Sequence, residues 1–267
     1  MTDLPETLKT SELQPPPVPW HLRPMAAIDT ETTGLSPQTG DRVIELGVVA
    51  FDNGEVTDRW SVLLDPQRPL DPEVTRLTGI KPEELQGQLA FADVVPQLLE
   101  KLAGRTLVAY NASFDRTFLI AEFSRAGAQL PRGARWLDPL VFAKVLQKGQ
   151  GNHKLGTVAK RLGVPLEEAH RASADAECAG WVLQKLAEQL PTDFDELIDL
   201  HEKWEGEQEF ERSQWKARAR GRQTGQVQPQ AEGLMQPQKS DIPAHALGPT
   251  YAYGDEIDPV RFMILHR

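Results

Sequence analysis

Apolar and polar residues alternate along this chain with two periods, one typical of strands and one typical of helices. Residues 22–190 hold short apolar runs that suit buried strands, and longer segments in which apolar residues recur at helical spacing. The Asn-Gly pair at 53–54 separates two apolar runs and predicts a hairpin. Strands are predicted at residues 24–29, 42–56 (ending in a turn at 52–54), 56–64 and 106–110, and near Trp136. Helices are predicted at residues 71–80, 91–104, 113–127, 139–147, 155–163 and 173–190.

The order of these elements indicates the fold class. Three early strands, followed by strands that alternate with helices, are typical of an α/β domain in which helices flank a mixed central sheet. Gly104 is the predicted C-cap of the helix at 91–104. The single cysteine, Cys178, excludes an intramolecular disulfide, and we expect a buried structural thiol in a reducing, cytoplasmic protein.

The two ends of the chain differ in composition from its middle. Residues 1–20 are acidic and proline-rich without an apolar core, so we expect a disordered leader and no secretory signal. Residues 191–222 predict a charged helical extension, with nine acids between 193 and 211 and five bases but no acid between 212 and 222. Residues 223–267 predict a flexible tail with an apolar C-terminal segment. No apolar stretch reaches the roughly 18 residues of a membrane span, so no membrane contact is expected.

The charge balance limits how this chain could bind nucleic acid. The net charge of −10 argues against tight, passive binding to a polyanion. The region 22–190 carries only −3 of that charge, because much of the acidity lies in the two ends. An enzyme that reaches a polyanion through bound metal ions can itself be acidic, so a nucleic-acid enzyme stays open.

The segment "IDTETTGL" places two carboxylates, Asp29 and Glu31, at the end of the first predicted strand. Side chains at i and i+2 of a strand point to the same face, so both acids converge on one spot. Their mutual repulsion would raise both pKa values unless a cation lay between them, and hard divalent ions bind carboxylate oxygens. The alternative is ordinary turn chemistry, because Asp, Thr and Gly are common where strands end.

Two further segments carry chemistry-bearing residues. "NASFD" places Asp115 in the first turn of the helix that follows the predicted strand at 106–110. "HRASADA" places His170 before a helix and Asp175 in its first turn. Each acid also suits simple capping of a helix N-terminus, and a lone His is more often a surface loop residue. The pattern of all five residues is more informative than any one of them.

With these three motifs in this order, residues 24–190 resemble the DEDDh 3′→5′ exonucleases, and look most like proofreading subunits of bacterial replicative DNA polymerases and their stand-alone relatives. The resemblance implies an RNase H-like exonuclease fold and an exonuclease domain at 21–190. It also implies two divalent metal ions, Mg²⁺ or Mn²⁺, and release of nucleoside 5′-monophosphates from a free 3′ end. The implied metal ligands are Asp29, Glu31, Asp115 and Asp175. The implied general base is His170, whose unperturbed imidazole pKa suits that task.

The same resemblance suggests residues that hold the substrate. The backbone around Thr30 and Thr32 would grip the terminal nucleotide, and Leu35 would pack against a base. Asn111 could form a hydrogen bond near the active site. For Leu35 the alternative is core packing, and for Asn111 it is satisfaction of the local backbone.

Function and partners are left with several alternatives. The expected partner is nucleic acid with a free 3′ end, preferably single-stranded DNA, but RNA trimming is an alternative because the motifs do not read the 2′-OH. A third reading is an inactive adaptor that acts through its tail, which the presence of all five residues disfavours. The tail could deliver the enzyme to a DNA polymerase or a sliding clamp, or it could cover a patch of the enzyme's own domain. Truncation after Pro191 would separate these two roles through the melting temperature.

Overall fold

A five-stranded mixed sheet forms the centre of the domain, in a computed structural model that describes residues 18–166 and 171–223, with only the backbone for the last five residues. The strand order is β3-β2-β1-β4-β5. Strand β1 pairs antiparallel with β2 and parallel with β4, and β4 pairs parallel with β5. The strands are β1 (Met25–Thr32), β2 (Val43–Asp52), β3 (Glu55–Leu63), β4 (Thr106–Val108) and β5 (Trp136–Leu137).

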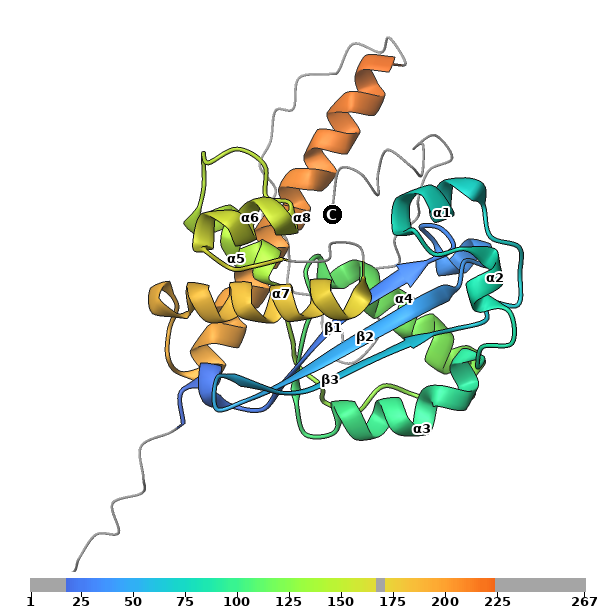
Figure 1. Cartoon of the computed structure of the whole chain (residues 1–267). Coiled ribbons are helices and arrows are strands. Elements are labelled where there is room, and N and C mark those ends of the chain that lie inside the picture. The colour runs from blue at the N-terminus through green and yellow to red at the C-terminus, as the bar shows by residue number, and fades with distance from the viewer. Residues whose placement is uncertain (1–17, 167–170, 224–267) are drawn as a thin grey trace, which may run out of the picture.

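Helices cover both faces of this sheet (Figure 1). The longer helices are α3 (Phe91–Leu102), α4 (Ala112–Arg125), α5 (Pro139–Leu146), α6 (Leu155–Leu162), α7 (Ala172–Leu186) and α8 (Phe194–Gln223). Shorter helical pieces are α1 (Pro72–Thr78), α2 (Pro82–Leu85) and three 3-10 turns at Trp20–Leu22, Pro37–Thr39 and Ala187–Gln189.

Strand β1 divides the core into two halves, because its side chains alternate between the two faces. Met25 and Ala27 belong to an apolar cluster that includes residues of α5, α6, α7 and α8. Ala26 and Ile28 belong to a second cluster with α3 and α4. Positions 29 and 31 therefore continue the face covered by α7, and positions 30 and 32 continue the face covered by α4.

Local sequence signals explain most of these elements. The turn between β2 and β3 is the predicted one, with Asn53 and Gly54 both at positive φ, as a two-residue hairpin turn requires. Asp71 caps the N-terminus of α1, and its side chain accepts a hydrogen bond from the Glu73 N–H. Cys178 is buried, and burial raises the pKa of its thiol to about 12, which suits a structural residue.

The structure confirms the predicted fold class and most of the predicted elements. One detail was wrong: α3 ends at Leu102 with Ala103 as an extended C-cap, so Gly104 instead serves the turn into β4 at positive φ. Helix α2 was not predicted, because its four residues are too few for a periodic pattern. No helix among the described residues has both the length and the apolar character needed to cross a membrane.

Helix α8 is anchored in the domain at its N-terminal end. Leu197, Ile198 and His201 are buried, and Trp204 packs against the same cluster as α7. The indole N–H of Trp20 donates to the Pro191 carbonyl at 2.7 Å, which fixes the chain just before this helix. The C-terminal half of α8 extends beyond the rest of the domain (Figure 1). The boundaries drawn from the sequence at 20/21, 190/191 and 222/223 stay predictions, and most of the expected leader and tail lies outside the described residues.

Candidate active site

Asp29 and Glu31 lie on the α7 face at the end of β1. The strand runs on to Thr32, further than the predicted 24–29, so both carboxylates are part of the ladder. The ladder to β2 shifts register between Glu31 and Thr32, because Ile44 is an extra residue on β2, as in a β-bulge. Asp29 is partly exposed and Glu31 is buried.

Helix α7 brings a third carboxylate to the same place. Asp175 lies in the first turn of α7, and that turn packs directly on Gly47, the β2 partner of Asp29. A Cβ at position 47 would lie 2.3 Å from the Ala172 carbonyl carbon and 2.4 Å from the Ser173 nitrogen. The missing side chain of Gly47 is therefore what lets the start of α7 approach the strands closely enough for Asp175 to join the pair.

These three residues form a group with the donor set of a divalent-cation site. One carboxylate oxygen from each of Asp29, Glu31 and Asp175 lies within 4.8 Å of the others. All donors are hard oxygens, and the group contains no thiolate or imidazole, so Mg²⁺ or Mn²⁺ fits better than a soft metal. The residues present therefore fit the metals that the sequence predicts.

Asp115, the fourth predicted ligand, lies on the α4 side of β1, next to Thr30. It is not a member of the group formed by Asp29, Glu31 and Asp175. It lies in the first turn of α4, is buried, and accepts a 2.8 Å hydrogen bond from the Thr30 hydroxyl at Oδ1. Thr30 lies between Asp29 and Glu31, so this bond fixes the start of α4 to the acidic end of the strand. The assignment of Asp115 as a metal ligand stays a prediction.

Thr32 ends β1, and Leu35 lies in the loop that follows, which is closed by hydrogen bonds. The Thr32 hydroxyl donates to the Gly34 carbonyl at 2.6 Å, and Asp41 accepts the Ser36 N–H across the loop. Asp41 packs so closely on Gly34 that a Cβ there would lie 2.4 Å from its Oδ2. Leu35 is partly exposed and belongs to none of the core clusters formed by the described residues, so core packing does not explain it.

Asn111 caps α4 in a left-handed backbone conformation, with φ at 65°. Its N–H and that of Ala112 each donate at 3.0 Å to the buried carboxylate of Asp138. Burial raises the pKa of Asp138 to about 6, although the N–H groups that it accepts, including that of Leu140, act to lower it. In turn the Asp138 N–H donates to Nε2 of His201 on α8, so this one residue ties α4, α5 and α8 together.

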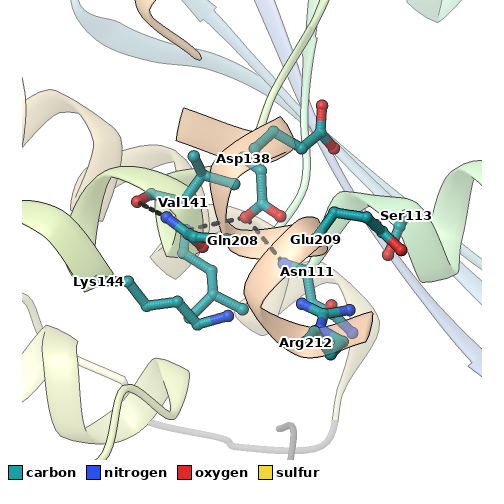
Figure 2. Close-up of a pocket in the computed structure, with 10 residues that line it drawn as sticks. Asn111, Ser113, Asp138, Val141, Lys144, Gln208, Glu209 and Arg212 are labelled. Atoms are coloured by element: carbon teal, nitrogen blue, oxygen red, sulfur yellow. Dashed lines mark hydrogen bonds between the residues drawn. The ribbon is translucent and has the colours of Figure 1, made fainter. Parts of the chain in front are cut away.

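A small cavity lies between these helices beside Asn111 and Ser113 (Figure 2). Its volume is about 20 Å³, which is room for about one water molecule and far too little for a nucleotide. Gln208 closes it by donating from Nε2 to the Val141 carbonyl at 2.9 Å, and Arg212 lines it from α8. This cavity therefore cannot hold the substrate of a nucleic-acid enzyme.

Glu45 is a buried acid of this site that the sequence reasoning missed. It lies directly opposite Glu31 in the ladder and accepts hydrogen bonds from the Ala172 N–H and the Ser61 hydroxyl. Its Oε1 is 3.7 Å from Nε of Arg171, and burial nevertheless raises its pKa. Glu45 thus holds the N-terminus of α7 in place. The sequence did contain a sign of it: Glu45 is the one acid in the apolar strand "VIELGVVAF", and it is an even number of residues from Gly47 and Phe51, so it shares their face of the strand.

His170, the predicted general base, lies outside the described residues. Arg171 and Ala172, which follow it in the chain, are both held by Glu45. Its role stays a prediction, as do the roles of Thr30, Thr32, Leu35 and Asn111.

Relatives of known name match the middle of the chain. A protein named 3′-5′ exonuclease DinG from Bacillus subtilis (strain 168) is 32% identical over 163 residues, which is 61% of this chain but 17% of that protein. A DNA polymerase III subunit epsilon from Treponema pallidum (strain Nichols) is 37% identical over 152 residues, 56% of this chain and 70% of that protein. The chain thus spans only a small part of the first relative and most of the second.

Solved structures share the fold. A structure of Exonuclease X in complex with 5′ overhanging duplex DNA superposes with a TM-score of 0.53 at 22% identity, covering 66% of this chain and 99% of that one. The nuclease domain of 3′hExo, a DEDDh family member bound to rAMP, gives a TM-score of 0.54 at 18% identity, covering 62% and 92%. At these identities the likeness shows the RNase H-like exonuclease fold.

The family model described as "Exonuclease" matches residues 26–183, a range that runs from β1 into α7 and holds all of the acidic residues described above. The five-stranded sheet, the acidic end of β1 and the start of α7 thus lie in or at the edge of one matched region, and the chain belongs to this exonuclease family.

Proposed function

We propose that this chain is a metal-dependent exonuclease that removes nucleotides from the 3′ end of DNA as nucleoside 5′-monophosphates, in proofreading or repair. The observation that carries the proposal is the group formed by Asp29, Glu31 and Asp175 at the end of β1. The DNA assignment is supported by the relatives named as a DNA polymerase III subunit and a 3′-5′ exonuclease.

The proposed roles follow from where the residues lie. The divalent metal would be held by Asp29, Glu31 and Asp175. Asp115, which accepts a hydrogen bond from Thr30, would be the fourth carboxylate ligand. DEDDh exonucleases use two such ions, which lower the pKa of the attacking water and offset charge on the leaving 3′ oxygen. His170 would accept the proton of that water.

The substrate would be held largely by backbone. The hydroxyls of Thr30 and Thr32 are buried and donate to Asp115 and the Gly34 carbonyl, so these hydroxyls are not available to a nucleotide. Leu35, partly exposed on its closed loop, would lie against the terminal base.

An RNA-trimming exonuclease of the same family is the second candidate. It is favoured by the structural likeness to 3′hExo, which was solved with rAMP. We propose DNA as the main substrate because one of the relatives at more than 30% identity is named as a subunit of a DNA polymerase.

One substrate panel tests the choice. End-labelled single-stranded DNA, single-stranded RNA of the same sequence, a duplex with a mismatched 3′ end and one with a paired 3′ end are digested side by side with Mg²⁺. We expect kcat/KM to be highest on DNA and the mismatched end to be cut faster than a paired one. Faster digestion of RNA than of DNA would overturn the DNA assignment, and no digestion of any substrate would leave the adaptor reading.

Partners beyond nucleic acid rest on residues that the structure does not describe. We propose that the tail, which ends in the apolar segment 262–265, delivers the enzyme to a DNA polymerase or a sliding clamp. Retention of the full chain, but not of a chain ending at Gln223, on an immobilised clamp or polymerase would support this, and equal retention would contradict it.

A further inference from the structure

The C-terminal half of α8 differs from the rest of the chain in charge. The first part of the helix is acidic, whereas Arg212, Lys216 and Arg218 follow without an intervening acid. Within the described part of the chain no ion pair holds Lys216 or Arg218. Basic side chains without an ion pair, on a chain of net charge −10, form a local positive surface that can attract an anionic partner.

This segment also presents an exposed tryptophan on a defined side of the helix. Trp215 is 71% exposed and lies among the three bases. It follows Gln208 by seven residues, which is close to two turns, and Gln208 faces α5 through its bond to the Val141 carbonyl. Trp215 therefore continues the domain-facing side of α8 past the edge of the domain. Phe210, 65% exposed, is rotated about 200° from Gln208 and faces away.

The basic segment starts beside the candidate active site. Arg212 lines the small cavity together with Asn111 and Ser113 at the start of α4 (Figure 2). The same first turn of α4 contains Asp115, which is bonded to Thr30 between the two acids of β1. From Arg212 to Gln223 the helix continues for about 16 Å, at 1.5 Å per residue.

We propose that residues 212–218 of α8 form a binding arm for single-stranded nucleic acid, which holds the strand upstream of the 3′ nucleotide in the active site. Basic side chains that track phosphates and an aromatic ring on which a base stacks are the two parts of such a site. The acidic first half of α8 repels the strand, so among the side chains that the structure describes on this helix the arm offers the most favourable contact. The family model ends at residue 183, so the arm lies outside the matched domain. The placing of the 3′ nucleotide in the active site rests on the proposed function, whereas the binding of a strand to the arm does not.

Binding without cleavage gives the first test. The full chain and its variants are titrated against fluorescent oligo(dT) in EDTA over a range of salt, with fluorescence anisotropy as the readout. We expect Trp215→Ala to raise Kd about tenfold through lost stacking. We expect Lys216→Gln/Arg218→Gln to make the slope of log K against log salt less steep by about 1.4, for two lost phosphate contacts at about 0.7 each.

Matched controls separate the arm from general effects. Phe210→Ala removes an exposed aromatic ring from the opposite side of the same helix, and Lys185→Gln/Lys203→Gln removes two exposed charges elsewhere. Both should bind oligo(dT) as the unaltered chain does. Kinetics give the second readout: with Mg²⁺ the arm variants should raise KM on a long strand and leave kcat, and all constants on a trinucleotide, unchanged.

The outcomes distinguish this proposal from the proposed function. Arm variants that bind oligo(dT) like their controls, or an unaltered chain that binds none, would overturn the arm. Arm variants that bind normally but lose a protein partner would overturn it in favour of a protein-docking surface. A chain that binds through the arm but cuts no substrate would keep the arm and refute the exonuclease.

Discussion

At the scale of single residues, the molecule concentrates negative charge where a protein without a cation would avoid it. Asp29, Glu31 and Asp175 share one small volume, and Glu45 lies next to Glu31 across the ladder. The burial of Glu31 and Glu45 makes that crowding more costly, because the low-dielectric interior screens it less than water does. A divalent cation is the simplest way to offset it.

This crowding predicts opposite effects with and without metal. Asp29→Asn and Asp175→Asn should each melt at or above the wild-type temperature in EDTA, because they relieve repulsion. Saturating Mg²⁺ should stabilise the wild type by about 2.7 kcal/mol at a hundredfold excess over Kd and the variants much less. Differential scanning calorimetry measures both, with the exposed Glu100→Gln as control. Equal stabilisation of variants and wild type by Mg²⁺ would rule out this site.

His201 makes the stability of the domain depend on pH. Burial lowers its pKa to about 4, and its Nε2 must stay unprotonated to accept the Asp138 N–H. The unfolded state therefore binds a proton near pH 6.5 that the folded state does not, so stability is lost as pH falls from 6.5 towards 4.

The expected loss is about 3 kcal/mol relative to His201→Gln, from the shift of about 2.5 in pKa. Denaturant unfolding of both proteins at several pH values measures it. Taking the difference between the two proteins removes most of the opposing contribution of Asp138, whose raised pKa favours folding at low pH. Parallel pH curves for the two proteins would show that His201 is not buried as described.

At the scale of elements, the site depends on how closely α7 can approach β2. Gly47→Ala would place a methyl group against the backbone of Ala172 and Ser173, so the start of α7 must move, and Asp175 with it. We expect a loss of about 1–3 kcal/mol in stability and a drop in kcat of at least about tenfold. The matched control is Gly206→Ala in α8, where an added Cβ meets nothing within 4 Å and should stabilise the helix by about 1 kcal/mol. Normal activity of Gly47→Ala would contradict this view of the site.

Helix α8 has two halves with different roles, and truncation separates them. A chain ending at Pro191 loses the buried Leu197, Ile198 and His201, and at about 2 kcal/mol per apolar side chain its melting temperature should fall by about 10 °C. A chain ending at Glu211 keeps these contacts and should melt within about 2 °C of the full chain. Unchanged melting of the shorter chain would show that α8 is only a tether.

The same elements show how far sequence reasoning reaches. Asp29 and Glu31 share a face because strand periodicity is local, and helix-start signals place Asp115 and Asp175 in first turns. Glu45 and Asp138 were missed because their importance comes from residues 127 and 26–27 positions away in the chain. The apolar stripe of α8 was visible, but the surface that covers it is set by the three-dimensional fold.

At the scale of the whole molecule, the sheet gathers chemistry from three separate segments at one end of β1. The segments around Asp29, Asp115 and Asp175 are far apart in sequence, yet the strand order puts β1 at the centre with α4 and α7 starting on either side of it. The family match spans all three. We therefore propose that the acidic end of β1 is a metal-dependent site that acts on a 3′ end.

Digestion of one DNA strand labelled separately at each end, with Mg²⁺, tests that claim most directly. We expect the 3′ label to leave at once as a mononucleotide, while the 5′-labelled strand shortens one nucleotide at a time. We expect no products in EDTA, and products reduced by orders of magnitude for Asp29→Asn. Release of the 5′ label first, internal cuts, or an Asp29→Asn protein as active as the wild type would contradict it.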